Sequence, residues 1–293
     1  MIYDVRHVTT IRYASIVRLA RFNLRLRPAP WPTQILKEYK LTIDPLPWTV
    51  QDEEGPYIVN RSRLTLKDPI AQLVIESRFT VDVLPPATAF DTALGPTVAE
   101  VRQRALDKHD LSKASPASYL YASPMAAMVP EIGDWAKRFF DDRTRVLAGG
   151  KALMEEIHAQ FRYDSKATSS DTPPAEAFDQ RRGVCQDFAH IMIIAARAQG
   201  IPAAYVSGYL RTLPPPGKPR LVGADATHAW ANLWCGDELG WVGFDPTNAI
   251  FVRTDHIFTA MGRDYSDVAP LDGVFHGGGG QAMDVAVDVE PVG

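Results

Sequence analysis

Residues 181–190 read RRGVCQDFAH, and their glycine and cysteine come just before a largely apolar run, residues 188–199. Gly200 and Pro202 follow that run, and a glycine with a proline just beyond it is a common signal for the end of a helix. The pattern therefore predicts a buried helix with Cys185 at or next to its N-terminus. The free N–H groups and the positive end of the helix dipole at that position favour a thiolate over a thiol.

A histidine and an aspartate follow in two segments that have the pattern of paired strands. Residues 227–230 read THAW and residues 243–248 read GFDPTN. Two registers of this hairpin are open, one with residue 234 opposite 241 and one with residue 233 opposite 240. Both place His228 and Asp245 on one face of the sheet, within reach of each other. The contact between that face and Cys185 does not follow from spacing.

Cysteine, histidine and aspartate are the residue types of an activated thiol nucleophile. A histidine cation beside a thiolate stabilises it and then donates a proton to the departing amine. The carboxylate fixes the tautomer of the ring and stabilises the imidazolium, and the backbone N–H at the helix start can donate to a tetrahedral oxyanion. We therefore regard Cys185 as the candidate nucleophile, His228 as base and acid, and Asp245 as the group that orients His228.

The composition is that of an ordinary globular protein of 293 residues, with 46% hydrophobic and 23% charged residues and a formal net charge of -4. This charge argues against a nucleic-acid-binding protein, and without about 18 consecutive apolar residues no membrane-spanning helix is expected. The histidines form no metal-ligand motif, so neither a metal nor another cofactor is expected. With two cysteines and no apolar signal stretch at the N-terminus, a reducing, cytoplasmic setting is favoured. The oligomeric state is left open.

The pattern of the chain changes near residue 85. Residues 1–84 contain short alternating segments separated by proline and glycine, which predicts an antiparallel β-sandwich, and they contain no catalytic cluster. Residues 85–96 are typical of a linker. Residues 97–293 show helical patterns followed by strands, which predicts an α+β catalytic domain. The alternating tail, residues 283–289, is expected to close the sheet of that domain.

Within residues 97–293 the pattern predicts individual elements. Helices are expected over residues 131–140, 148–161 and 172–182 and after Cys185, and strands over 205–210, 228–234 and 241–245. Residues 213–219 are typical of a proline-rich loop, and residues 277–280 of a flexible glycine loop.

These segments resemble the transglutaminase-like superfamily of papain-type thiol enzymes. The resemblance lies in residues 182–190, 200–203, 205–209, 226–230, 240–248 and 262–267. It covers residues 150–290 well, and residues 1–84 resemble the β-domain that commonly precedes this core in bacteria. The resemblance implies a papain-like core with Cys185 as nucleophile, His228 as base and then acid, and Asp245 as the orienting residue. It also implies acyl transfer from a peptide or protein amide, through a thioester, to water or to an amine.

Three alternatives to hydrolysis are considered: transfer of the acyl group to an amine, an arylamine acetyltransferase, and a non-catalytic binding scaffold. The cross-linking members of eukaryotes need calcium, and this chain has no acidic loop of the calcium-site type, so hydrolysis by a peptidase or amidohydrolase ranks above transfer to an amine. An arylamine acetyltransferase uses the same three residue types but differs in its cysteine motif and domain order. A non-catalytic binding scaffold is the third alternative, and the presence of all three residue types argues against it.

Five further residues are candidates for lining the cleft: Trp230, Tyr163, Asp187, Tyr209 and Asp264. Simpler interpretations stand beside them. Trp230 and Tyr163 are the kind of residue that fills a core, Asp187 can cap a helix, and Asp264 lies in a polar segment that can be a solvated loop. Cys235, in the expected hairpin turn, is interpreted as incidental.

Overall fold

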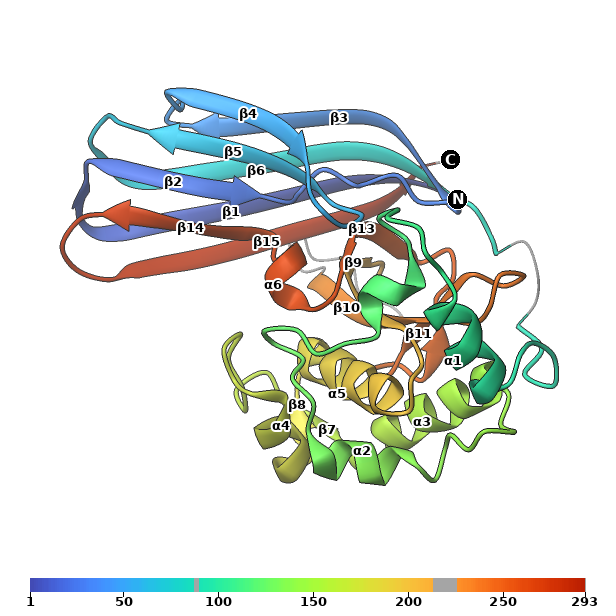
Figure 1. Ribbon diagram of the computed structural model, residues 1–293. Coiled ribbons are helices and arrows are strands. Elements are labelled where there is room, and N and C mark those ends of the chain that lie inside the picture. Colours follow the sequence, from blue (N-terminus) through green and yellow to red (C-terminus); the bar gives the residue numbers. More distant parts are fainter. Residues whose placement is uncertain (87–89, 213–225, 293) are drawn as a thin grey trace, which may run out of the picture.

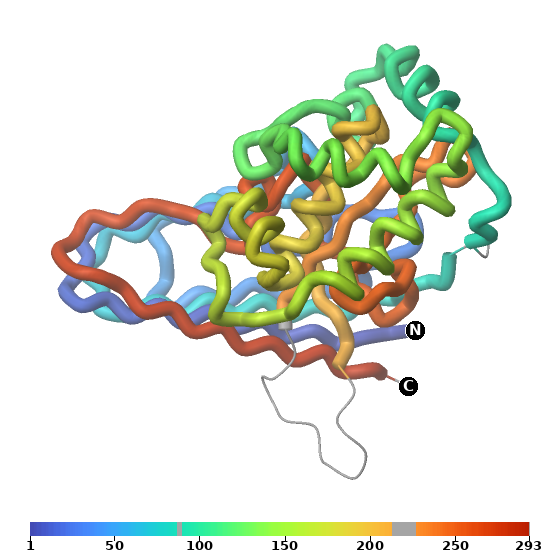
Figure 2. Tube along the Cα trace, turned by 90° about the horizontal axis from the view of Figure 1, so that it is seen from below, coloured from blue at the N-terminus to red at the C-terminus, as the bar shows by residue number. Residues whose placement is uncertain are grey.

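The computed structural model describes residues 1–86, 90–212 and 226–292, and its elements form three layers (Figure 1). A β-sandwich forms one layer, a five-stranded sheet lies in the middle, and most of the helices form the layer on the far side. Figure 2 views the molecule from the helical side, with the sandwich behind. The predicted α+β class with a β-rich N-terminal region is confirmed. Within the described ranges, no helix is both long enough and apolar enough to cross a membrane.

The sandwich consists of two antiparallel four-stranded sheets. The first has the order β15 (Gln281–Val292), β1 (Ile2–Val17), β6 (Ile70–Val83) and β3 (Gln34–Asp44). The second has the order β14 (Leu271–His276), β2 (Leu19–Leu24), β5 (Asn60–Leu66) and β4 (Thr49–Glu54).

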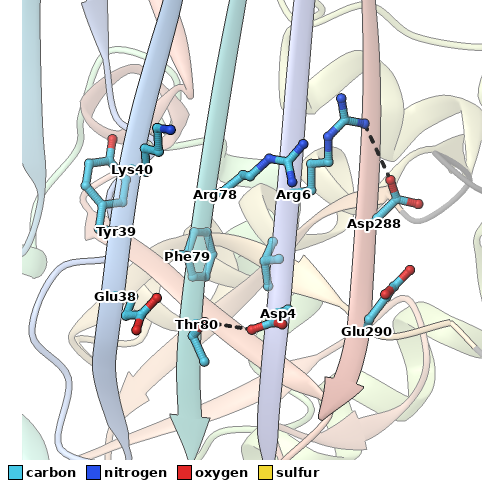
Figure 3. Close-up of a pocket in the computed structure, with 11 residues that line it drawn as sticks. Asp4, Arg6, Glu38, Tyr39, Lys40, Arg78, Phe79, Thr80, Asp288 and Glu290 are labelled. Atoms are coloured by element: carbon cyan, nitrogen blue, oxygen red, sulfur yellow. Dashed lines mark hydrogen bonds and ion pairs between the residues drawn. The ribbon is translucent and has the colours of Figure 1, made fainter.

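Alternation of side chains explains the first of these sheets. Val5 and Phe79 are buried, while their neighbours Arg6 and Arg78 point to the outer face. Charged side chains from the strands of this sheet surround a hollow on that outer face, as Figure 3 shows. Each strand thus contributes one apolar face to the core and one charged face to the surface.

The middle layer is an antiparallel sheet with the order β12 (Ile250–Phe251), β11 (Trp241–Asp245), β10 (Ala226–Trp234), β9 (Ala203–Leu210) and β13 (His256–Gly262). The longer helices are α1 (Val98–Leu106), α2 (Pro130–Ala136), α3 (Val146–Gln160), α4 (Pro174–Gln180) and α5 (Cys185–Ala198). The short elements are the 3₁₀ helix η1 (Pro116–Tyr119), α6 (Tyr265–Val268), β7 (Arg162–Tyr163) and β8 (Arg182–Gly183). Helix α5 is buried along its length and packs against β9 and β10.

The helices expected near residues 131, 148, 172 and 185 are present as α2 to α5. Helix α1 was not expected, although its start has a recognisable signal. Thr97 Oγ1 accepts a hydrogen bond from the backbone N–H of Glu100, and the Glu100 carboxylate accepts one from the backbone N–H of Thr97. A threonine with a glutamate three residues later is the sequence signature of this capping box. The expected loop at 213–219 and residues 87–89 of the expected linker lie outside the described residues.

The expectation that the tail closes the sheet of the second domain is wrong. Strand β15 pairs with β1 over its whole length, from Ile2 opposite Val292 to Tyr13 opposite Gln281. Strand β14 likewise pairs with β2, and residues 277–280 connect β14 to β15. Alternation identifies a strand and its buried face but does not identify its partner. The chain therefore returns to the sandwich after the five-stranded sheet is complete, and both termini lie side by side (Figure 1).

The pairing of β15 with β1 predicts which side chains of β15 stabilise the fold. Val289 is 1% exposed, whereas Val285, on the same strand, is 47% exposed. We expect Val289→Ala to lower the free energy of unfolding by about 1–3 kcal/mol, because it removes buried methyl groups from the apolar cluster between the first sheet of the sandwich and the five-stranded sheet. Val285→Ala should change it by less than about 0.5 kcal/mol. Urea denaturation measures both, and equal effects of the two substitutions would contradict the pairing of β15 with β1.

Candidate active site

Helix α5 begins at Cys185, and the side chain of Asp187 fixes that beginning. Asp187 Oδ2 accepts hydrogen bonds from the Val184 backbone N–H at 2.8 Å and from the Thr168 hydroxyl at 2.6 Å. Burial raises the pKa of Asp187, and these two hydrogen bonds act in the opposite direction. A Cβ atom on Gly183 would lie 2.5 Å from Asp187 Oδ2, so this position requires glycine. Asp187 therefore holds the turn that presents Cys185.

Strands β10 and β11 bring His228 and Asp245 together. Trp234 lies opposite Trp241, which is the first of the two registers considered for this hairpin. His228 Nε2 lies 2.8 Å from Asp245 Oδ2, and both side chains are buried. The alternation of side chains along the hairpin therefore gave the correct face for both residues.

The carboxylate of Asp245 is surrounded by hydrogen-bond donors. Its Oδ1 accepts from the backbone N–H groups of Thr247 at 3.0 Å and Asn248 at 3.2 Å. Its Oδ2 accepts from the Asn248 side-chain amide at 2.7 Å, in addition to the bonds from two histidines. Burial acts to raise the pKa of Asp245, but the bonds from His228, His256 and Asn248 outweigh burial and hold the pKa well below its ordinary value. Asp245 is therefore a buried anion at neutral pH.

His228 is the cationic partner of this anion. Burial acts to lower the pKa of His228, but hydrogen bonds to Asp245 and Cys185 outweigh that effect and raise the pKa to about 10. Because Nε2 faces Asp245, Nδ1 is the nitrogen left for the Cys185 sulfur. An imidazolium between a buried carboxylate and a cysteine at a helix start is an arrangement that stabilises a thiolate.

His256 was not singled out by the sequence. Its Nε2 lies 3.1 Å from Asp245 Oδ2, and its Nδ1 lies 3.3 Å from the backbone N of Arg253. The Arg253 N–H can only donate, so Nδ1 accepts and the ring proton lies on Nε2, directed at Asp245. No spacing rule could have identified this residue, because β13 reaches the site by pairing with β9.

His228, Asp245 and His256 also form a group whose potential metal-ligating atoms lie within 4.8 Å of one another. A metal ion would need the lone pair of each histidine nitrogen. In His256, Nδ1 accepts a hydrogen bond and Nε2 bears the proton, so Nε2 has no free lone pair for a metal. The two histidines are therefore better suited to hydrogen-bonding the Asp245 carboxylate than to coordinating a metal ion.

Two of the remaining candidate residues lie near the reactive groups. Trp230 is 2% exposed, and its ring centroid lies 6.2 Å from that of His228 and 5.4 Å from that of His256. A Cβ atom on Gly208 would lie 2.6 Å from the Trp230 ring, so this glycine gives the indole its space. Tyr163 is 55% exposed, and burial followed by the charge of Cys185 raises its pKa. Tyr163 therefore flanks Cys185 at the surface.

Tyr209 and Asp264 occupy other places. The Tyr209 hydroxyl lies 3.0 Å from Nδ1 of the buried His7, so it links the five-stranded sheet to the sandwich. Asp264 is fully buried and caps α6, where it accepts from the Ser266 backbone N–H at 2.9 Å and from the Met125 backbone N–H at 2.8 Å. Both cysteines are free, and Cys235 is buried, where burial raises the pKa of its thiol.

Comparison with known proteins agrees with this fold. Residues 133–246 match the transglutaminase-like superfamily, and residues 3–82 match the bacterial transglutaminase-like N-terminal region. The uncharacterized protein Rv2569c of Mycobacterium tuberculosis is 36% identical over 99% of this chain and 92% of its own length. The chain belongs to the transglutaminase-like superfamily.

Two further proteins resemble this chain over different extents. A "putative cysteine protease" from Cytophaga hutchinsonii has a solved structure that superposes with a TM-score of 0.75, at 19% identity, over 100% of this chain and 92% of that one. It therefore shares the whole fold. A protein-glutamine gamma-glutamyltransferase of Pseudomonas aeruginosa is 41% identical over 100 residues, which cover 33% of this chain and 15% of that protein.

The two cysteines should differ strongly in reactivity. Cys185 is partly exposed next to His228, whereas Cys235 is 0% exposed. At neutral pH we expect iodoacetamide to alkylate Cys185 on the order of 100-fold faster than Cys235, because only Cys185 is accessible and hydrogen-bonded to a cationic histidine at the start of a helix. Peptide mass spectrometry gives both rates, with Cys235→Ala as the control that keeps the fast reaction. Equal rates in the folded protein, or no slowing in His228→Ala, would contradict this site.

The protonation of His228 should also make stability depend on pH. The pKa of His228 is about 10 in the folded protein, against an ordinary value of 6.5 in the unfolded chain. Between these values the folded state binds more protons, so the stabilisation is complete below 6.5 and is lost as the pH rises towards 10. Urea denaturation from pH 6 to pH 10 should show this loss in the wild type and a much smaller one in Asp245→Asn. The same pH dependence in both proteins would contradict the ion pair.

Proposed function

We propose that this protein is a cysteine-dependent enzyme that transfers the acyl group of a peptide or protein amide, with water as the usual acceptor. The observation that supports this proposal most is the His228 ring, held by the buried carboxylate of Asp245 and hydrogen-bonded to Cys185 at the start of α5. A nucleophile, an acid–base group and an orienting anion in contact are the parts that acyl transfer through a thioester needs.

The first half of the reaction forms the thioester. The Cys185 thiolate attacks the amide carbonyl carbon, and the resulting oxyanion accepts a hydrogen bond from the Cys185 backbone N–H at the helix start. His228 then donates its Nδ1 proton to the amine nitrogen, the C–N bond breaks and the amine leaves. His228 becomes neutral, and its Nε2–H still donates to Asp245.

The second half consumes the thioester. Neutral His228 accepts a proton from water, the water oxygen attacks the thioester carbonyl, and the C–S bond breaks to give a carboxylic acid and the thiolate–imidazolium pair. An amine can take the place of water and gives a new amide. The 41% identity to a protein-glutamine gamma-glutamyltransferase supports the amine as the alternative acceptor, although the match covers only 15% of that protein.

The free cysteines favour a reducing, cytoplasmic setting for this reaction. We assign the sandwich a supporting role, because it contacts the five-stranded sheet through pairs such as His7 with Tyr209 and Gln34 with Phe258.

A library assay tests the proposed function. Purified protein is incubated with peptide, isopeptide and glutamine-containing libraries and with cell-wall peptides, and products are identified by mass spectrometry, with Cys185→Ala as the control. The proposal expects cleavage or amine exchange that is absent from the control. Full turnover of the same substrate by Cys185→Ala would place the nucleophile elsewhere.

A graded loss of activity is expected between variants of Cys185 and Asp245. On a substrate found in this way, Cys185→Ala should abolish turnover, and Asp245→Asn should lower kcat by roughly 100- to 10,000-fold, because the ring tautomer and the imidazolium lose their support. Steady-state kinetics measure both, with circular dichroism to confirm that each variant is folded. An Asp245→Asn enzyme with wild-type kcat would show that the carboxylate only stabilises the fold.

The acceptor is identified by competition. With water as the usual acceptor, the acid product should form without any added amine, and added methylamine should divert only part of the product to the methylamide. Product that forms only when methylamine is present would instead establish an amine-dependent transferase.

A further inference from the structure

A cavity of about 450 Å³ lies between the sandwich and the face of the five-stranded sheet that points away from α5. Its wall contains aromatic and aliphatic side chains from both layers, chiefly Trp31, Trp230, Trp241, Val252 and Phe258. Its volume falls within the range of small-molecule sites, about 300–1,000 Å³. Cys185 is not among its lining residues, so the cavity is separate from the place where an acyl substrate reacts.

The aromatic rings of this wall are held in fixed orientations. Trp31 stacks on Phe258 with ring centroids 4.4 Å apart and an angle of 11° between the rings. The Trp241 indole N–H donates to the Ala114 carbonyl at 3.0 Å. Trp31 and Trp241 are only partly buried, so they present apolar ring surface to the cavity. Flat ring surface of this kind fits a flat, apolar ligand body.

The rim of the cavity contains a cation to which the described part of the chain offers no carboxylate partner. Among residues 1–86, 90–212 and 226–292, no carboxylate lies within ion-pair distance of the exposed Arg253 guanidinium. Glu238 also lines the cavity, but its carboxylate lies 3.1 Å from the Arg104 guanidinium. The uncompensated charge at the rim is therefore positive, and it fits a carboxylate on the ligand.

The cavity and the candidate active site share two wall residues. His256 lines the cavity, and its Nε2 lies 3.1 Å from Oδ2 of Asp245. Trp230 lines the cavity as well and packs against both His228 and His256. A molecule in the cavity would therefore contact the residues that hold the Asp245 carboxylate and the His228 ring in place.

We propose that this cavity binds a small aromatic carboxylic acid, with its ring between Trp31, Trp230 and Trp241 and its carboxylate at Arg253. The occupant acts on the reactivity of Cys185 through His256 and Asp245. The binding stands independently of the proposed function, whereas the effect on Cys185 rests on it.

Binding is tested with indole-3-acetate as the probe and indole-3-acetamide as its neutral counterpart, by isothermal titration calorimetry on the full chain. Indole-3-acetate should bind the wild type about tenfold more tightly than the amide, as expected for one charge-assisted contact. Arg253→Gln should remove that preference. Arg12→Gln, which removes an equal charge from the part of β1 next to the β14–β15 turn, should keep it.

Location within the cavity is tested with two more variants. Val252→Trp, which places an indole in the cavity, should abolish binding of indole-3-acetate, whereas Cys185→Ala should leave binding unchanged. The proposal is overturned if the wild type does not bind the probe, if Arg253→Gln binds the acid as the wild type does, or if Val252→Trp has no effect. It is also overturned if an N-acetylated dipeptide ending in phenylalanine binds more tightly than indole-3-acetate, because the occupant would then be a peptide end.

The effect on the candidate active site is measured as the rate of Cys185 alkylation by iodoacetamide with and without saturating indole-3-acetate. The rate should change in the wild type and in Arg12→Gln, and should not change in His256→Leu, where the link to Asp245 is cut. An unchanged rate in the wild type overturns the coupling while the binding result stands. Failure of the library assay, in contrast, would overturn the proposed function and leave the calorimetric result as it is.

Discussion

The buried carboxylate of Asp245 is the constraint on which the site depends. Burying a charged carboxylate without hydrogen-bond partners would cost several kcal/mol. Each strand that supplies a hydrogen-bond donor to Asp245 is therefore held in its position. His228 comes from β10, His256 from β13, and the remaining donors from the turn that follows β11. One side chain thus ties together three strands of the middle sheet and sets the protonation of the histidine beside Cys185.

The sandwich reaches the site through that sheet. The side-chain amide of Gln34 in β3 bonds to both polar groups of the Phe258 backbone, at 2.8 Å and 2.9 Å. Phe258 lies two residues after His256 on β13, so this pair fixes the strand from which His256 reaches Asp245. After the five-stranded sheet the chain returns to the sandwich, where β15 pairs with β1, so both ends of the chain belong to one sheet of the sandwich. These contacts connect the sandwich to the sheet that carries His228, Asp245 and His256.

The parts that sequence predicted are those governed by local periodicity. Helix α5 was predicted from its apolar run and its glycine stop, and the hairpin of β10 and β11 from alternation, which also placed His228 and Asp245 on one face. The partner of β15 could not be predicted, because an alternating strand fits the edge of either sheet. His256 could not be predicted either, because its role depends on the pairing of β13 with β9. Asp264 and Tyr209 lie in segments that carry the family resemblance. Both are buried by tertiary packing, which the spacing of residues along the sequence does not predict.

The central claim is that Cys185 forms a thioester under the control of His228 and Asp245. Mass spectrometry of the intact protein, mixed rapidly with an activated acyl ester, tests it most directly. The account predicts a single added acyl group on the peptide that contains Cys185, which hydroxylamine removes, and much slower acylation of His228→Ala. Acylation at another residue, or equal rates in wild type and His228→Ala, would contradict it.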